Sequence, residues 1–174
     1  MDSRAESAQR LVNRHALYSA AAGLVPVPLV DIAATTGIQI KMLKELADNY
    51  GIPFQADRGK SLVGALIGGV LPTRMAYGLG GSLIKAVPVV GGLLGMVTAP
   101  AFASASTYAI GKVFMTHFAS GGTLLDFDPE AMRQHFVSEY EAASKAGVTT
   151  PAPAAAAEVV AGRVGKAVAA AQPG

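Results

Sequence analysis

The sequence predicts an all-α fold with little polar surface, and three observations support this. Hydrophobic residues make up 51% of the 174 residues and charged residues only 15%, whereas a typical soluble domain is about 25% charged. Lys85 and Lys112 flank an uncharged run of about 26 residues, which exceeds the ~20 residues that span a bilayer as a helix. Apolar residues on both sides of this run recur at the spacing of amphipathic helices.

We therefore expect three parts: an N-terminal amphipathic αα-hairpin, a Gly-rich apolar core of two to three helices, and a C-terminal amphipathic helix. Residues 1–146 are predicted to form a single helical membrane-associated domain. Residues 147–174 consist largely of Ala, Pro, Val and Gly, a low-complexity composition that is typical of a tail outside the packed core.

The first helix of the hairpin is expected from Ser3 to near Gly23. It ends there because Pro26 and Pro28 each disfavour a helical conformation in the preceding residue. One face of this helix is predicted to pack, and it carries Leu11, Val12, His15, Tyr18, Ser19 and Ala22.

The second helix is expected from Leu29 to Tyr50 and has the clearest apolar periodicity in the chain. Pro28 fits its first turn, and Asp31 lies near the positive end of the helix dipole, where a carboxylate is favoured. Gly51 is available for the left-handed residue that ends many helices. Other faces of this helix carry the polar residues Thr35, Gln39, Lys41, Lys44, Glu45 and Asp48.

A third helix is expected from Gly59 to Val70, with Asp57 as its cap and Pro72 after its end. Gly64 and Gly68 are spaced so that two helix backbones can approach closely, as helices do in membranes.

The uncharged run is expected to form helical pieces near 75–86, 88–99 and 100–118, because an interior proline such as Pro88 or Pro100 breaks or kinks a helix. Gly91 and Gly95 repeat the spacing of Gly64 and Gly68.

The last helix has a strong start signal. Asp128 is expected to cap it, Pro129 to occupy its first position and Glu130 to lie in its first turn. The helix should run to about Lys145.

Several residues are candidates for an interaction or a structural contact. Asn13, Arg14 and His15 form a polar triplet that is either an interaction surface, a proton-sensitive contact or a salt-bridged hairpin interface, with Asp31 as one possible partner. Asp31 is either an intramembrane carboxylate on a proton or cation path or a dipole partner, and Lys85 either snorkels to an interface or lines a polar interior. The remaining candidates are Pro26, Pro28, Tyr50, Gly51, Gly64, Gly68, Gly91 and Gly95.

No catalytic constellation is found, and we expect no enzyme, no cofactor and no metal. The chain has no cysteine, which excludes thiol catalysis and Cys-ligated metal. His15, His117 and His135 have no local ligand spacing. Asp126 and Asp128 flank Phe127 before the last helix, where capping is favoured over binding of a divalent cation.

The formal net charge of +2 and the sequence pI near 9.0 reflect a small excess of Lys and Arg. Nucleic-acid binding requires clustered charge, so we expect no nucleic-acid partner. Attraction to an anionic membrane surface is favoured instead.

Several motifs resemble a bacterial family of YcjF-like membrane-domain proteins, often found with Era-like or dynamin-like GTPase domains. The resemblance covers roughly residues 10 to 140, and its PVPLVD elbow, residues 26–31, is fairly specific. Further similar motifs are LVNRHA at 11–16, QIKM at 39–42, LADNYG at 46–51 and TYAIGKVF at 107–114.

This resemblance implies a helical domain of the bacterial inner membrane with no assigned chemistry. The chain itself carries no GxxxxGK[ST] phosphate loop, so any nucleotide dependence has to come from another chain. We expect the protein at the cytoplasmic face of the inner membrane or on a lipid-bounded intracellular structure.

The expected partners are therefore a lipid membrane, copies of the same chain and a GTPase. A membrane-shaping scaffold or a docking partner for a GTPase is the favoured function. One alternative is a small oligomeric channel or transporter, and another is a soluble self-assembling shell. A channel would line a common axis with polar residues drawn from Ser82, Lys85, Thr98, Ser104, Ser106, Thr107 and Tyr108.

Overall fold

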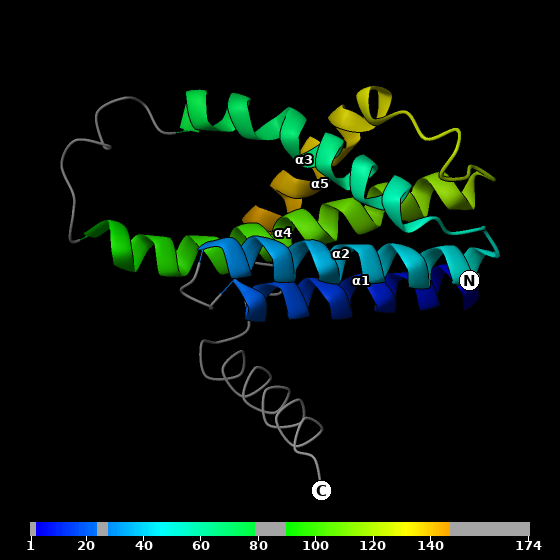
Figure 1. Cartoon of the computed structure of the whole chain (residues 1–174), viewed down its shortest axis with the longest axis horizontal. Helices are drawn as coiled ribbons and strands as arrows, with labels where there is room; N and C mark the ends of the chain where they lie inside the picture. The colour runs from blue at the N-terminus through cyan, green and yellow to red at the C-terminus, as the bar shows by residue number, and fades with distance from the viewer. Residues whose placement is uncertain (1–2, 24–27, 79–89, 147–174) are drawn as a thin grey trace, which may run out of the picture.

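The computed structural model describes residues 3–23, 28–78 and 90–146, with side chains described for 3–23, 33–68 and 100–145. These residues form five α-helices and no strand, so the all-α prediction is confirmed (Figure 1). The helices are α1 (Ser3–Ala22), α2 (Pro28–Tyr50), α3 (Ala56–Gly78), α4 (Val90–Ala119) and α5 (Pro129–Ala146).

Helix α4 lies at the centre of the structure and packs against each of the other four helices. The hairpin of α1 and α2 runs along one side of it, and α3 and α5 pack on each other at another side (Figure 1). A hydrogen bond of 3.2 Å from Asn49 Nδ2 to the carbonyl of Arg4 joins the end of α2 to the start of α1. The predicted αα-hairpin is therefore observed.

Two helices end at a glycine with a positive φ, and the first of these ends, at Gly51, was predicted from the sequence. Gly51 has a φ of 73°, and its N–H donates to the Asp48 carbonyl while the Ile52 N–H donates to the Ala47 carbonyl. This pair of bonds is the Schellman motif. Gly121, with a φ of 86°, ends α4 in the same way.

The start of α5 also follows its sequence signal. Asp128 Oδ1 accepts hydrogen bonds from the Glu130 N–H at 2.9 Å and the Ala131 N–H at 3.3 Å, and Pro129 is the first helical residue. A capping carboxylate satisfies N–H groups that have no partner within the helix. Asp57, in contrast, lies inside the first turn of α3 and does not precede it.

Two predicted proline breaks are wrong. Helix α3 continues past Pro72 to Gly78, and α4 contains Pro100 within its length. A proline removes one backbone N–H and crowds one carbonyl, but the neighbouring residues keep their own bonds. The predicted pieces that include residues 79–89 lie outside the described residues.

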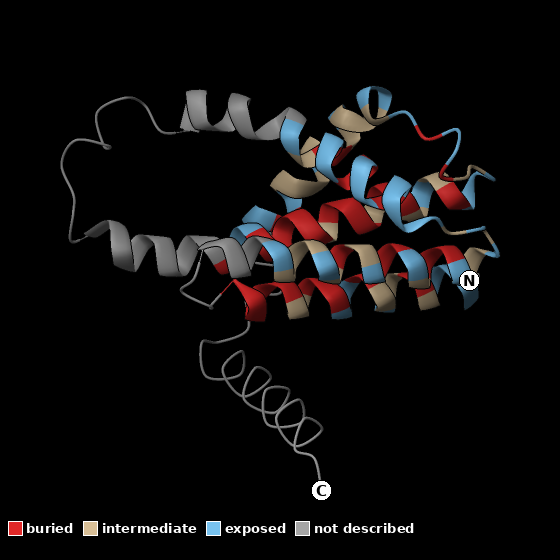
Figure 2. Cartoon of the chain, viewed as in Figure 1, coloured by how far each residue is buried: buried red, intermediate tan, exposed pale blue. Residues whose placement is uncertain are grey.

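One hydrophobic core joins all five helices, so the amphipathic hairpin and the apolar helices are not separate layers (Figure 2). The ring of Phe114 lies at its centre and stacks on Phe127 with ring centroids 4.2 Å apart. The largest fully buried apolar side chains are Phe114, Met42, Leu43, Leu46, Leu66 and Ile110.

We expected a transmembrane helix in the uncharged run. Within residues 3–23, 28–78 and 90–146, none of the helices combines the length and the apolar composition that a membrane-spanning helix requires. The run begins in the segment 79–89, which is not described.

Helices α1 and α4 approach each other closely at Gly111. A Cβ atom at this position would lie 2.6 and 2.7 Å from the two methyl carbons of Val12, and Val12 itself is fully buried. The absence of a side chain at Gly111 therefore allows the contact. Gly64 on α3 differs, because a Cβ there meets no atom within 4 Å.

We predict that Gly111→Ala lowers the free energy of unfolding by about 1–3 kcal/mol, because the added methyl overpacks the contact with the stiff side chain of Val12. The matched control Gly64→Ala should be neutral or stabilise by up to ~1 kcal/mol, since alanine is the better helix former. Urea unfolding followed by far-UV circular dichroism measures both. Equal effects at the two glycines would contradict the close approach.

Candidate functional site

A buried hydrogen-bonded junction connects the three helices α1, α2 and α4. Gln39 Nε2 of α2 donates to Thr107 Oγ1 of α4 at 3.1 Å, and Thr107 Oγ1 donates to Ser19 Oγ of α1 at 2.8 Å. All three residues are at most 1% exposed. We call Ser19, Gln39 and Thr107 the polar junction. Polar side chains that bond across helix interfaces are a common way to hold helices together in membranes.

The polar junction is incompletely satisfied. Gln39 Oε1 has no hydrogen-bond partner among the described residues, and neither does Thr35 Oγ1, one turn earlier on α2. A buried polar atom without a partner costs about 1–3 kcal/mol. The bundle interior therefore tolerates acceptor atoms that a purely structural core would avoid.

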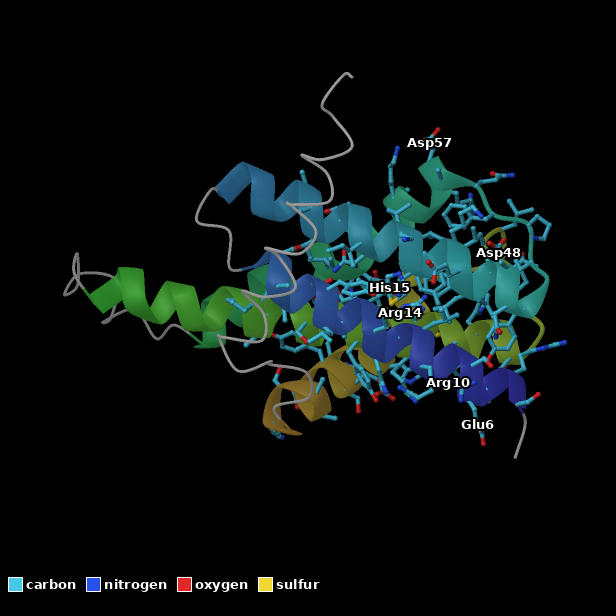
Figure 3. The ribbon with its side chains drawn as sticks, turned by 90° about the horizontal axis from the view of Figure 1, so that it is seen from below. Glu6, Arg10, Arg14, His15, Asp48 and Asp57 are labelled. Carbon is cyan, nitrogen blue, oxygen red and sulfur yellow. The ribbon has the colours of Figure 1, made fainter. Side chains whose placement is uncertain are left out.

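A charged cluster lies beside the junction, where α1 faces α2 (Figure 3). Glu45 of α2 accepts from Arg14 Nη2 of α1 at 2.5 Å, and its other carboxylate oxygen lies 3.8 Å from Lys41 Nζ and 3.7 Å from His15 Nε2. We call Arg14, His15, Lys41 and Glu45 the Glu45 cluster. Three basic side chains thus share one carboxylate that is 27% exposed.

His15 is the buried member of this cluster, with 1% of its side chain exposed. Its Nδ1–H donates to the carbonyl of Leu11 at 2.9 Å, which leaves Nε2 of the neutral ring as an acceptor without a partner. The edge of the ring meets Tyr18 with centroids 5.7 Å apart. Burial lowers the pKa of His15 below 6.5, and this effect outweighs the opposing attraction of Glu45.

A second polar cluster shapes the turn between α4 and α5. His117 Nε2–H donates to the carbonyl of Thr123 at 2.9 Å, and the carboxylate of Asp126 accepts from both the N–H and the hydroxyl of Thr123. These bonds hold the pKa of Asp126 below its usual value. Arg58 of α3 donates to the carbonyls of Leu124 and Leu125 at 2.7 and 2.8 Å. The cluster therefore fixes the turn.

The structure brings together only part of what the sequence singled out. Arg14 and His15 join the Glu45 cluster, while Asn13 points to the surface and accepts from Gln9 Nε2 at 2.9 Å. Tyr50 lies at the end of α2, where its ring contacts Phe118 with centroids 6.1 Å apart.

The other candidates remain separate. Gly64 and Gly68 are exposed, and a Cβ added at either position would meet no atom within 4 Å. Pro26 and Lys85 lie outside the described residues. Pro28, Asp31, Gly91 and Gly95 lie in helices, but nothing beyond their backbone is described. No group of three metal-ligating side chains is found in the described part of the chain.

Sequence reasoning missed Glu45 and Gln39. Both fall on the predicted polar faces of α2, yet Gln39 is fully buried, and Glu45 binds Arg14 and lies 3.7 Å from His15 Nε2. A single polar residue beside an apolar stripe does not show whether another helix covers it. The placement of His15 and Ser19 on the packing face of α1 was the available signal.

Comparison with known proteins gives two matches. The family model described as "Domain of unknown function (DUF697)" matches residues 1–142. A relative named Magnetosome membrane protein 22, from Magnetospirillum gryphiswaldense, is 40% identical over 134 residues, which cover 77% of this chain and 69% of the relative. No solved structure matches the chain.

We predict that Thr107→Val destabilises the protein by about 1–3 kcal/mol, because it leaves the buried Gln39 amide without its acceptor. The combined variant Ser19→Ala, Gln39→Leu, Thr107→Val removes all the partners together and should be less destabilised than Thr107→Val alone. Urea denaturation of both variants measures this, and a triple variant that is the least stable would argue against the junction.

The protein should lose stability as the pH falls below 6.5. The unfolded chain binds a proton at His15 with the ordinary pKa, whereas the folded chain resists it, so the stabilisation is complete above pH 6.5 and is lost as the pH falls toward the lower folded pKa. Nuclear magnetic resonance titration of the His15 ring should give a midpoint below 6.5, and His15→Gln should flatten this part of the stability profile. A midpoint at 6.5 would exclude a proton-sensitive contact here.

Proposed function

We propose that this chain, which belongs to the DUF697 family of domains of unknown function, is a membrane-associated, non-enzymatic helical protein that assembles with copies of itself. The resemblance to an uncharacterised membrane-domain family is confirmed. The relative from Magnetospirillum gryphiswaldense is a membrane protein of the magnetosome, which supports membrane association for this chain. The location that we propose for this chain is the cytoplasmic face of the inner membrane or a lipid-bounded intracellular structure.

The observation that carries this proposal is the exposed face of α3. From Ser61 onward the described exposed positions of this helix are Ser61, Gly64, Ala65 and Gly68, none of them charged. A surface helix of a soluble protein has charged and polar residues opposite its core face. The other face of the same helix already packs into the core through Leu66, which is fully buried. The uncharged face is therefore suited to lipid or to another copy.

The charged side chains support an apolar contact over an electrostatic one. Arg14 and Lys41 share Glu45, and Lys44 Nζ lies 2.9 Å from the carboxylate of Asp48. Attraction to anionic lipid requires cations that are free to face the headgroups. Further cations of the described helices pair within the chain in Arg10–Glu6, Lys60–Asp57, Arg133–Glu130 and Lys145–Glu141.

A scaffold that shapes a membrane or docks a GTPase is the more specific role that we propose. The chain carries no phosphate loop of its own, so the nucleotide would be bound by the partner. The charged outer face of the α1–α2 hairpin, opposite its packed face, is the surface available to a soluble partner.

The channel alternative is not favoured by the positions of the hydroxyl groups. Thr107 is bonded to Ser19 and Gln39, and Ser106 Oγ donates to the Ala103 carbonyl at 3.1 Å. Both hydroxyls are buried inside one chain, so they are not placed to line an axis between several chains.

Flotation with vesicles tests the membrane association. We expect the purified chain to rise with phosphatidylcholine vesicles in a density gradient, and to do so equally at low salt and at about 1 M salt, where the Debye length is ~3 Å. If binding requires anionic lipid and disappears at high salt, the membrane association is caused by electrostatic attraction and not by apolar contact. A chain that stays in the dense fraction under all these conditions contradicts the proposal.

Sedimentation velocity tests the self-assembly. We expect a species larger than one chain, in detergent or in plain buffer, because small residues on an exposed helix face allow the backbone of a second copy to approach closely. A large particle in plain buffer that does not bind vesicles would favour the alternative of a soluble self-assembling shell. A well-behaved monomer in plain buffer would argue against both membrane association and assembly.

A further inference from the structure

Several charged side chains of the described residues lie away from the outer ends of α3 and α4. In Figure 3 the labelled residues Glu6, Arg10, Asp48 and Asp57 lie on the side away from the start of α4. The start of α4 extends beyond the ends of α1 and α2, and the last turns of α3 run toward the same side (Figure 1). We call the last turns of α3 and the first turns of α4 the apolar end.

The sequence of the apolar end carries one charged residue, Arg74 near the end of α3. Within α4 the first charged residue is Lys112, and within α3 no charge occurs between Lys60 and Arg74. Both segments are helical, so their backbone N–H and C=O groups are bonded internally except in the terminal turns, which leaves few backbone groups to desolvate in an apolar medium.

Several described residues where the apolar end joins the bundle are also uncharged and exposed. Gly64, Ala65 and Gly68 of α3 are exposed, as is Ala101 of α4. Phe102 is 39% exposed although its ring edge meets Tyr140 with centroids 5.9 Å apart. A large aromatic side chain that is partly open to its surroundings lies beside small residues that bring no charge or polar group.

We propose that the protein contacts the bilayer through this apolar end, with the α1–α2 hairpin and the turn between α4 and α5 held in water. This rests on the membrane association proposed above and adds which end of the molecule enters the lipid. The driving force is burial of apolar surface in the lipid. The charged pairs at the other end stay in water, since moving them into lipid would cost desolvation free energy.

The sequence allows a direct test, because it contains no cysteine and each introduced cysteine is therefore a unique labelling site. Ala101 and Ala119 are exposed residues of α4. They are 18 residues apart, which is five turns, so they share one helix face and lie about 27 Å from each other. Ala101→Cys and Ala119→Cys thus form a matched pair that differs only in position along the helix.

On α3, Ala65→Cys and Ala56→Cys give a second pair of exposed positions, one toward the apolar end and one at the start of the helix. Each variant carries an environment-sensitive fluorophore. We expect phosphatidylcholine vesicles to shift the emission to shorter wavelength and raise its intensity several-fold at positions 101 and 65, and to leave positions 119 and 56 unchanged.

The outcomes separate this inference from the proposed function. If the labelled chains float with vesicles and all four positions respond alike, or only 119 and 56 respond, the assigned end is wrong while membrane association stands. If no variant floats, the proposed function fails first. A full response at 101 and 65 without vesicles, rising with protein concentration, would place a second copy of the chain there and overturn the bilayer contact.

Discussion

The close packing of α1 on α4 sets the positions of most other parts of this structure. Val12 can reach the backbone of α4 only because Gly111 has no side chain. At this separation the Lys112 ammonium reaches Gln9 Oε1 at 3.1 Å, and farther along the antiparallel pair the hydroxyls of Thr107 and Ser19 come within 2.8 Å. The absence of a side chain at Gly111 thus favours the helix separation at which these polar side chains bond.

The second helix of the hairpin uses the surface that this packing creates. It adds Gln39 to the buried hydroxyls and Glu45 to the basic side chains of α1. The hairpin therefore presents a mixed interior, with hydrogen bonds beside an apolar core, and a charged exterior whose ions pair with each other. Exposed ion pairs contribute only about 0–1 kcal/mol each, so the apolar and hydrogen-bonded contacts dominate the stability of the hairpin, while the charges keep its outer face in water.

The far side of α4 is fixed by the turn that follows it. Gly121 ends the helix, and the ring of Phe127 returns onto Phe114 in the core. Arg58 of α3 binds the carbonyls of the same turn, so one loop orients both α3 and α5 relative to the centre. The segments at the opposite ends of α3 and α4 carry few charged residues in the sequence. The molecule therefore has a tightly bonded charged end and an apolar end, and the proposed contact with lipid follows from that difference.

The sequence by itself determined the all-α class, the hairpin, and the ends of helices where the signal is local. Gly51 and Asp128 act through the few residues beside them, so their roles follow from spacing alone. Only the tertiary structure decided which polar residues are buried, because that depends on which helix lies opposite. Gln39 and Glu45 are both polar residues of α2, yet Gln39 is fully buried and Glu45 is partly exposed. This difference in burial depends on how α1 and α4 pack against α2. The continuation of α4 through Pro100 was decided in the same way, since the packing of a long helix offsets the loss of one backbone bond and local sequence does not report it.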